Sequence, residues 1–337
     1  MKTACLLITL VVTALINGVA YPAPVFTPKE PSLGARAYLL QDFASGRILA
    51  EHNVDERLEP ASLTKIMTSY VVFHQLEEGN IKLQDETVVS EKAWRMPGSR
   101  MFIEVGSRVT VEDLLQGVIV QSGNDASVAL AEHIAGSQEG FAALMNEHAR
   151  YLGMNDTHFV NAEGLPHSEH YTTARDMAIL TRALIARFPS RYLGHAQKEF
   201  TYNNIRQPNR NRLLWRDSSV DGVKTGYTKS AGYCLVTSAK RNNMRLVSVI
   251  MGSKSPRRRT QETQTLLTYG FRFFETHRVF AAQETIQTTR VWEGASRTLG
   301  LGLEEDLFVT VPRGAFKRVK TELSGVVRAV APISLGS

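Results

Sequence analysis

The chain has 337 residues, of which 43% are hydrophobic, 21% charged and 8% aromatic. This composition supports a large core and excludes a disordered or fibrous protein. Lys and Arg exceed Asp and Glu by 39 to 33, but the excess is spread along the chain. A nucleic-acid-binding protein gathers its positive charge on one face, so no nucleic-acid partner is expected. The charge is compatible with an anionic substrate or cell envelope.

The first 20 residues are predicted to be a secretory signal peptide. After a basic start, an apolar run extends from Ala4 to Ile16, and Gly18-Val19-Ala20 supplies small residues for cleavage. The apolar run is short for a membrane span, and no later segment reaches about 18 uninterrupted apolar residues. Removal of this segment leaves Cys234 as the one cysteine, so the mature chain is expected to have no intramolecular disulfide.

The pattern up to residue 277 predicts strands at both ends with helices between them. A hairpin is expected from strands at 37–41 and 47–50, followed by a helix at 61–78 that is apolar on most sides. Further helices are expected at 110–120, 126–135, 174–187 and 260–275, and further strands at 220–227, 233–240 and 245–251. Consecutive hairpins predict an antiparallel sheet assembled from distant segments. The fold class is therefore predicted to be mixed α/β, of the α+β type with an antiparallel sheet.

The character of the sequence changes beyond residue 277. Short strand-like runs at 285–291, 307–311 and 326–330 alternate with turns, and no strong helical pattern is present. We therefore predict a large domain at 33–277 and a small all-β domain at 278–337. An independent β-sandwich usually needs about 100 residues, so the second domain is expected to be incomplete at its C-terminus.

Three short motifs stand in order along the large domain: Ser62-Leu63-Thr64-Lys65, Ser122-Gly123-Asn124 and Lys224-Thr225-Gly226. Each is weak by itself, since a chance Ser-x-x-Lys is expected roughly once in a chain of this length. Their order, wide spacing and different structural settings make the combination specific.

The first motif begins the apolar helix. Residues three apart share a helix face, so the Lys65 amine can reach the Ser62 hydroxyl. A serine hydroxyl needs a base before it attacks, and a lysine becomes that base when burial and nearby cations lower its pKa. We interpret Ser62 as a nucleophile and Lys65 as its base. The alternative, a helix cap followed by a surface lysine, fits poorly because a lysine is unfavourable at a helix start.

The second motif interrupts a helix, which is expected to aim Ser122 and Asn124 into a cleft. Ser122 is a candidate proton relay between Lys65 and the leaving amine. Asn124 is a candidate either for holding a peptide carbonyl of the substrate or for orienting Lys65. An ordinary glycine-containing loop would be the default interpretation without the other two motifs.

The third motif lies on a predicted strand, where Lys224 and Gly226 face the same side. Gly226 allows a substrate backbone to pair closely with the strand edge. Lys224 is expected to place a positive charge at a terminal carboxylate, and Thr225 to donate its hydroxyl. The backbone N–H of Tyr227 is a candidate oxyanion-hole donor beside that of Ser62.

With these motifs the sequence resembles the low-molecular-mass penicillin-binding proteins, specifically the serine-type D-alanyl-D-alanine carboxypeptidases. The likeness runs from about residue 37 to the last residues and includes Glu59-Pro-Ala-Ser-Leu-Thr-Lys65, Gln121-Ser-Gly-Asn-Asp125 and Tyr269-Gly-Phe-Arg-Phe-Phe-Glu275. It implies a β-lactamase/DD-peptidase-like domain, with a five-stranded antiparallel sheet between helices, followed by an all-β domain.

The resemblance implies a function in peptidoglycan synthesis, cell wall biogenesis and cell shape. The enzyme would remove the terminal D-alanine from peptidoglycan stem pentapeptides through an acyl-enzyme on Ser62. β-Lactam antibiotics would be acylating inhibitors, so the enzyme would be penicillin-sensitive. The implied location is the periplasm. A peripheral attachment to the inner membrane stays open, because the amphipathic anchor helix of such relatives would lie beyond Ser337.

The resemblance also implies individual roles. Lys65 would be the proton acceptor, Ser122 the proton relay and Lys224 the substrate-binding lysine. Arg259 resembles a family arginine near the carboxylate end of the site, and Arg210 is a weaker candidate for the same neighbourhood.

No cofactor or metal is expected. His167-Ser-Glu-His170 contains two histidines but not the helical His-Glu-x-x-His pattern of a zinc site, and no further ligand set follows.

Two other enzymatic functions of the same superfamily remain as alternatives. A D,D-endopeptidase that cuts crosslinks would share all three motifs. A class A β-lactamase takes its deacylating base from a Glu-x-x-x-Asn segment, and the match between the second and third motifs is Glu199-Phe-Thr-Tyr-Asn203. Its alternating aromatics predict a strand, which favours slow hydrolysis of a penicilloyl-enzyme. A non-enzymatic sensor or scaffold is a third alternative, and the intact motif set argues against it.

Overall fold

The computed structural model describes residues 28–294, 296–322 and 329–330. The predicted signal peptide, with Cys5, therefore lies outside the described residues. Within these ranges, no helix combines the length and the apolar character needed to cross a membrane.

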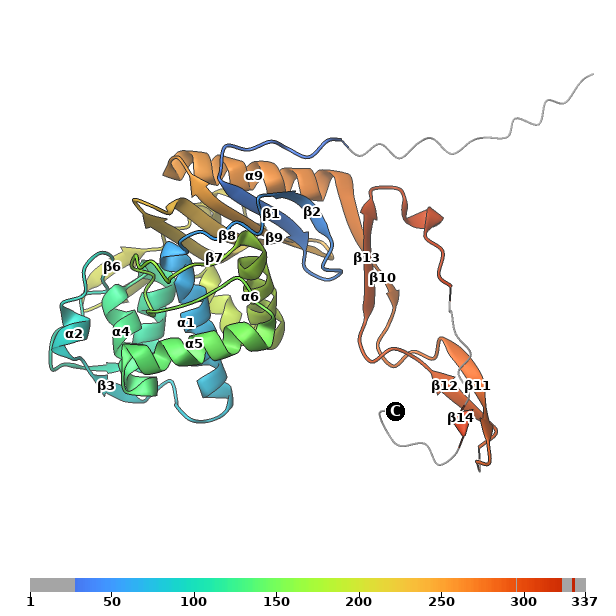
Figure 1. The fold of residues 1–337 in the computed structure, drawn as a ribbon, viewed down its shortest axis with the longest axis horizontal. Coiled ribbons are helices and arrows are strands. Elements are labelled where there is room, and N and C mark those ends of the chain that lie inside the picture. The colour runs from blue at the N-terminus through green and yellow to red at the C-terminus, as the bar shows by residue number, and fades with distance from the viewer. Residues whose placement is uncertain (1–27, 295, 323–328, 331–337) are drawn as a thin grey trace, which may run out of the picture.

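A five-stranded antiparallel sheet forms the centre of the large domain (Figure 1). Its strands lie in the order β2-β1-β9-β8-β7. Their bounds are Ala37–Asp42 for β1, Ile48–His52 for β2, Val220–Thr228 for β7, Gly232–Arg241 for β8 and Met244–Ser253 for β9. β1 pairs along its whole length with β9, so that Leu40 lies opposite Ser248. The predicted sheet of distant segments is confirmed.

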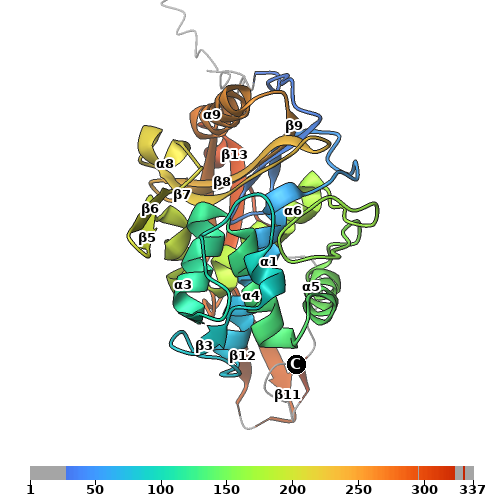
Figure 2. The same cartoon turned by 90° about the vertical axis from the view of Figure 1, so that its left-hand side faces the viewer.

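Helices cover both faces of this sheet, as Figures 1 and 2 show. One face is covered by α9 (Pro256–Phe273), and the other by a layer that includes α1 (Thr64–Glu77), α4 (Asn124–Ala135), α5 (Gln138–Leu152) and α6 (Ala174–Arg187). Successive side chains of a strand point to opposite faces. Leu39 accordingly packs into the core on the α1 side, while Leu40 packs beneath α9. The predicted α+β architecture is confirmed.

Helix α1 lies in the interior, as its apolar sequence predicted. Ile66, Met67 and Val71 are fully buried, and burial of each such side chain contributes roughly 1.5–3 kcal/mol. The helix ends at Glu77, and Gly79 follows with φ of 74°, a left-handed conformation that favours glycine.

The predicted helix at 110–120 consists of α3 (Val111–Gln116) and a wider turn at Gly117–Gln121. Thr110 caps it by accepting a hydrogen bond from the backbone N–H of Asp113 at 3.1 Å. Thr173 caps α6 in the same way through Asp176, also at 3.1 Å. Both caps were predicted.

The closing helix differs from its predicted range of 260–275. It begins at Pro256, because the Ser255 hydroxyl caps it and proline suits a first helical turn. It ends at Phe273, because the chain from Phe274 pairs with a later strand. Glu275 therefore lies in a strand.

Shorter elements complete the large domain. They are β3 (Glu86–Val88), α2 (Glu91–Trp94), β4 (Arg108–Thr110), α7 (Pro189–Tyr192), β5 (Glu199–Tyr202), β6 (Ile205–Pro208) and α8 (Leu213–Arg216).

The C-terminal part consists of strands in the ranges that the structure describes, apart from one short turn of helix at Phe316–Arg318 (Figure 1). β10 (Phe274–Phe280) pairs with β13 (Leu307–Pro312), and β11 (Gln287–Trp292) lies between β12 (Thr298–Leu301) and β14 (Ala329–Val330). The predicted strand at 326–330 is described only as β14. Hydrogen bonds attach this part to the β1–β2 turn: Thr276 donates to Asp42 at 2.8 Å, and Arg47 donates to the backbone oxygen of Thr310 at 2.6 Å.

The loop that follows α5 crosses the start of α1 at Gly164. This glycine has φ of +87°, and a Cβ added to it would lie 1.9 Å from the backbone oxygen of Ala61. Because Ala61 precedes the first motif, the absence of a side chain at Gly164 fixes how closely the loop approaches Ser62.

Replacing Gly164 with Ala is expected to destabilise the protein by about 2–5 kcal/mol, since left-handed strain of about 1–2 kcal/mol adds to a steric overlap of about 1–3 kcal/mol. Gly153→Ala is the matched control: φ there is +79°, but no atom lies within 4 Å of the added Cβ. The control should lose only about 1–2 kcal/mol. Urea unfolding measures both, and equal losses would contradict this account.

Candidate active site

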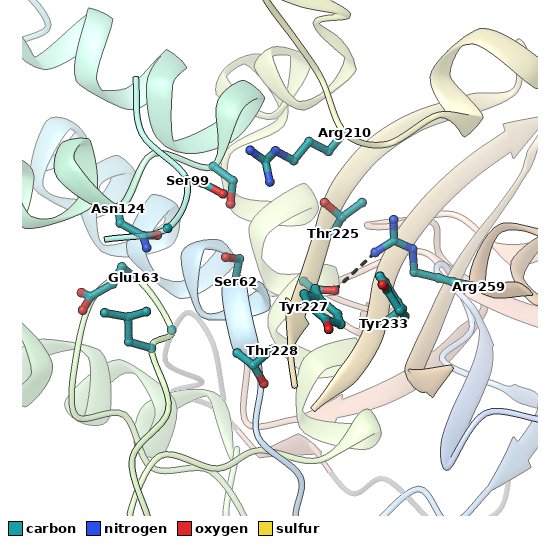
Figure 3. Close-up of a pocket in the computed structure, with 15 residues that line it drawn as sticks. Ser62, Ser99, Asn124, Glu163, Arg210, Thr225, Tyr227, Thr228, Tyr233 and Arg259 are labelled. Atoms are coloured by element: carbon teal, nitrogen blue, oxygen red, sulfur yellow. Dashed lines mark hydrogen bonds between the residues drawn. The ribbon is translucent and has the colours of Figure 1, made fainter. Parts of the chain in front are cut away.

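One hollow of about 490 Å³ brings parts of all three motifs together (Figure 3). Ser62, Ser122 and Asn124 line it on one side, and residues of β7 line it on the other. The lining β7 residues are Thr225, Gly226, Tyr227 and Thr228, and Arg259 joins them from α9. Every predicted site residue except Lys65 and Lys224 lines this pocket. These two lysines are buried behind its wall.

The Lys65 amine lies within hydrogen-bond distance of Ser62. Its Nζ is 3.3 Å from the Ser62 Oγ, 2.7 Å from the Asn124 Oδ1 and 2.6 Å from the backbone oxygen of Glu163. The two short contacts are to atoms that only accept hydrogen bonds. A neutral amine can donate to both and still direct its lone pair toward the hydroxyl of Ser62.

Electrostatics favour that neutral form. The Lys65 side chain is fully buried, and burial lowers its pKa to about 7, an effect that the charge of Glu163 partly opposes. About half of the amines would therefore be unprotonated near pH 7. Burial would thus give Lys65 the base character that the apolar helix predicted.

The second motif is fixed by an unusual backbone. Ser122 ends the wide turn after α3 with φ of 67°, in the left-handed region, and α4 begins at Asn124. Asn124 both accepts from Lys65 and donates through its Nδ2 to the backbone oxygen of Pro97 at 2.6 Å. Of the two roles considered for Asn124, the contacts fit the orientation of Lys65.

The third motif places its lysine differently from the expectation. Lys224 is only 3% exposed, and its Nζ donates to the Ser122 Oγ at 2.8 Å and to the backbone oxygen of Thr225 at 3.1 Å. Burial and then the nearby Lys65 hold the pKa of Lys224 well below its usual value. Lys224 thus contacts Ser122 instead of lying open to the pocket.

Gly226 allows β7 to lie directly against the turn at residues 60–63, which carries Ser62. A Cβ there would meet the backbone oxygen of Pro60 at 3.2 Å and the backbone nitrogen of Leu63 at 3.3 Å. A larger residue would push strand and turn apart. The close approach brings the β7 backbone that leads into Tyr227 beside the turn that carries Ser62.

Two arginines supply the positive charge that faces the pocket. Arg259 donates to the backbone oxygens of Gly226 at 3.3 Å and of Cys234 at 3.1 Å, which holds its guanidinium beside β7. Arg210 also lines the pocket, and its side chain extends toward Ser99 (Figure 3). The neighbours Arg257 and Arg258 are exposed and line no part of this pocket.

Sequence reasoning missed several residues of this pocket, among them Ser99 and Glu163. Ser99 follows a turn at Gly98, which has φ of +85°, and its backbone oxygen accepts from the N–H of Asn124 at 2.7 Å. Glu163 is 3% exposed, its Oε2 has no hydrogen-bond partner, and burial raises its pKa. Two features of the sequence could have pointed to them. Ser99 ends a Pro-Gly-Ser turn at 97–99, and Glu163 is a single carboxylate before the apolar segment Gly-Leu-Pro at 164–166.

His170 supports the start of α1. Its Nε2 lies 2.8 Å from the Thr64 hydroxyl, and its Nδ1 accepts from the backbone N–H of Val160 at 3.0 Å. Burial lowers its pKa to about 3, so it stays neutral at physiological pH. His170 therefore helps to fix Thr64, two residues after Ser62.

Asp125 anchors the loop that carries Ser99. Its carboxylate is fully buried and accepts backbone hydrogen bonds from Met101 at 2.9 Å, Phe102 at 3.0 Å and Ile103 at 3.4 Å. One side chain thus ties residues 101–103 to the first turn of α4, which carries Asn124. The position of the pocket rim depends on this contact.

Two family models match this chain. Residues 24–255 match the family model of D-alanyl-D-alanine carboxypeptidases, and residues 274–337 match the C-terminal domain of penicillin-binding protein 5.

Individual relatives match over most of the chain. D-alanyl-D-alanine carboxypeptidase DacC of Escherichia coli is 52% identical, over 87% of this chain and 75% of its own length. DacA of the same organism is 44% identical, over 87% and 74%. The crystal structure of penicillin-binding protein 5 from Haemophilus influenzae superposes with a TM-score of 0.88 and 42% identity, covering 92% of each chain.

Asp125→Ala is expected to destabilise the protein by about 3–5 kcal/mol, because it leaves up to three buried or partly buried backbone N–H groups without an acceptor. Hydrogen exchange should accelerate most at Met101–Ile103. Asp85→Ala is the matched control, since Asp85 is partly exposed and accepts from one backbone N–H, that of Lys82 at 2.7 Å. It should cost about 1 kcal/mol. Comparable losses in urea unfolding would show that the loop does not depend on Asp125.

Proposed function

The chain belongs to the D-alanyl-D-alanine carboxypeptidase family and is a serine-type carboxypeptidase of that kind. From this premise we propose that Ser62 is the residue that becomes acylated when the terminal D-alanine is removed from a peptidoglycan stem pentapeptide. The observation that carries the proposal is the buried Lys65 amine, whose pKa is about 7 and which lies 3.3 Å from the Ser62 hydroxyl.

Acylation begins when Lys65 accepts the proton of Ser62. The Ser62 Oγ then forms a bond to the carbonyl carbon between the two D-alanines, and the backbone N–H groups of Ser62 and Tyr227 stabilise the oxyanion. The C–N bond breaks as the leaving amine takes a proton. Ser122 is suited to deliver it, because its hydroxyl is already hydrogen-bonded to the Lys224 amine at 2.8 Å.

The leaving D-alanine carries a carboxylate, and Arg259 and Arg210 supply the positive charge for it. Lys224 was expected to hold this carboxylate itself. Because Lys224 is buried behind Ser122, we propose that it acts through Ser122. The two arginines and the Thr225 hydroxyl, which line the pocket, would then contact the carboxylate directly. A guanidinium can bind a carboxylate with two parallel hydrogen bonds, which favours this division.

β-Lactams are proposed to acylate Ser62, and the resulting acyl-enzyme is proposed to hydrolyse slowly. The Glu-x-x-x-Asn match begins on β5 at Glu199, which lines no part of the pocket and pairs with Arg206 instead. No deacylating base is therefore supplied by that segment. Deacylation of the peptide acyl-enzyme by water completes the carboxypeptidase cycle.

The intact nucleophile and base argue against a sensor or scaffold. We further propose that residues 1–20 are a signal peptide, that 33–277 form the catalytic domain and 278–337 the β domain, and that the mature protein works in the periplasm. Peripheral attachment to the inner membrane is proposed as an additional property, to be tested by membrane fractionation of the native chain.

Ser62→Ala is expected to abolish D-alanine release from a pentapeptide ending in D-Ala–D-Ala, because it removes the hydroxyl that lies 3.3 Å from the Lys65 amine and is proposed to form the acyl-enzyme. Mass spectrometry after brief penicillin exposure should give one adduct, on the peptide that contains Ser62. Ser45→Ala, in the β1–β2 turn away from the pocket, is the control and should keep both activities. Release of D-alanine by the Ser62 variant would exclude this mechanism.

The pH dependence follows from the pKa of Lys65. Below about pH 7 the amine is protonated and cannot accept the Ser62 proton, so kcat/KM for D-alanine release should fall tenfold per pH unit. Above pH 7 it should level off. Glu163→Gln should move the midpoint to lower pH, because the charge of Glu163 raises the pKa of Lys65. A rate that is constant between pH 5.5 and 8 would contradict Lys65 as the base.

A further inference from the structure

The two ends of the active-site pocket differ in charge. Arg210 and Arg259 line it, and Ser62 lies between Arg210 and Thr228 in the view of Figure 3. Thr228 is the last residue of β7. Just beyond it lies Glu59, which does not line the pocket itself but whose Oε2 accepts a hydrogen bond from the Thr228 hydroxyl at 3.2 Å. A substrate that extends past Thr228 would therefore meet a carboxylate.

Hydroxyl groups hold the Glu59 carboxylate in place. The same Oε2 also accepts from the Ser230 hydroxyl at 2.5 Å, and the side chain is partly exposed. Two other acids of this segment, Asp55 and Glu56, pair with arginines at 2.6 Å each. Among the residues that the structure describes, no cation pairs with Glu59. Its charge is thus fixed in position and available to a ligand.

One turn carries both the nucleophile and this carboxylate. Glu59 comes three residues before Ser62, and between them the backbone oxygen of Pro60 would lie 3.2 Å from a Cβ added to Gly226. The contact that fixes the Ser62 turn against β7 therefore also fixes the place of Glu59 relative to the nucleophile.

The direction of a bound stem peptide follows from the proposed function. β7 is an edge strand of the five-stranded sheet, and an extended peptide can add to such an edge. The carboxylate of the leaving D-alanine would lie beside Thr225, and the scissile carbonyl beside the backbone N–H of Tyr227. The earlier residues of the stem would then run past Thr228 toward Glu59.

The group that reaches Glu59 can be identified from the chemistry of the stem. An extended chain advances about 3.3 Å per residue, so the third residue of the pentapeptide would lie near the end of β7. This third residue is a diamino acid, and its side chain ends in an amine that is either free or acylated in a crosslink. A free amine is protonated, and it is the cation that an unpaired carboxylate attracts.

We propose that Glu59 binds the free side-chain amine of this diamino acid, so that the enzyme favours pentapeptides whose amine is free over those whose amine is engaged in a crosslink. The inference rests on the proposed function, because it uses the orientation that the proposed site gives to the stem. Glu59 would act through an ion pair with the substrate and take no part in the transfer of protons.

The experiment compares two pentapeptides on the full-length enzyme. Both have lysine as their third residue and a blocked N-terminus; one has a free side-chain amine, and in the other this amine is acetylated. The test variant is Glu59→Gln, which keeps an oxygen that can accept from Thr228 and Ser230 but removes the charge. The matched control is Glu78→Gln, an exposed acid at the far end of α1 from Ser62.

The readout is the ratio of kcat/KM for the free amine to that for the acetylated amine. It should be at least about 3 in the wild type and the control and fall to about 1 in Glu59→Gln, as expected for loss of one partly exposed ion pair. Glu59→Asp, which keeps the charge, should retain part of the preference. The wild-type ratio should also fall when salt is raised from about 50 to about 500 mM, because the attraction is screened.

Failures of the two proposals are distinguishable. A wild type that releases D-alanine equally from both peptides overturns this inference alone, whereas one that releases none from either overturns the proposed function. If Glu59→Gln slows both peptides and leaves the ratio unchanged, Glu59 only supports the turn and the inference is wrong. It is also wrong if the preference is lost in Glu163→Gln instead, because the amine would then be recognised by the carboxyl inside the pocket.

Discussion

The amine of Lys65 is removed from water on every side, and the remainder of the site is arranged around it. A charged ammonium is unfavourable in this position, so burial lowers the pKa of Lys65 to about 7, which suits the role of base that we propose for it. The amide of Asn124 and the backbone oxygen of Glu163 satisfy its hydrogens. Those two acceptors come from different segments, which is why a long stretch of chain must fold correctly before Ser62 becomes reactive.

Close backbone approaches hold these segments in register. Gly226 lets β7 lie against the Ser62 turn, and Gly164 lets the loop carrying Glu163 cross the start of α1. Asp125 then ties the Ser99 loop to α4 through backbone hydrogen bonds. Each contact fixes a short distance between backbone segments, so the geometry of the pocket depends on the packing of the backbone. Backbone N–H groups that are held in place in this way can stabilise a developing oxyanion without further rearrangement.

Positive charge in the site is divided between two lysines and two arginines. Burial lowers the pKa values of Lys65 and Lys224, which suits the proton transfers proposed for this site. Burial also lowers the pKa values of Arg259 and Arg210, but a guanidinium stays charged because its ordinary pKa is so high. The arginines are therefore suited to the proposed binding of a carboxylate.

The sequence alone determined most of the elements and the contacts that depend on local spacing. The interval from Ser62 to Lys65 is one helical turn, the caps at Thr110 and Thr173 are local, and the hairpin β8–β9 joins neighbouring segments. The pairing of Lys224 with Ser122, the pairing of Asn124 with Lys65, and the place of Ser99 and Glu163 in the pocket could not be predicted. The hydrogen bonds of Lys65 with Asn124 and Glu163, and of Lys224 with Ser122, join residues 59, 98 and 102 positions apart. Only the tertiary packing decides them, because burial and distance across the fold, rather than sequence spacing, set which polar groups meet.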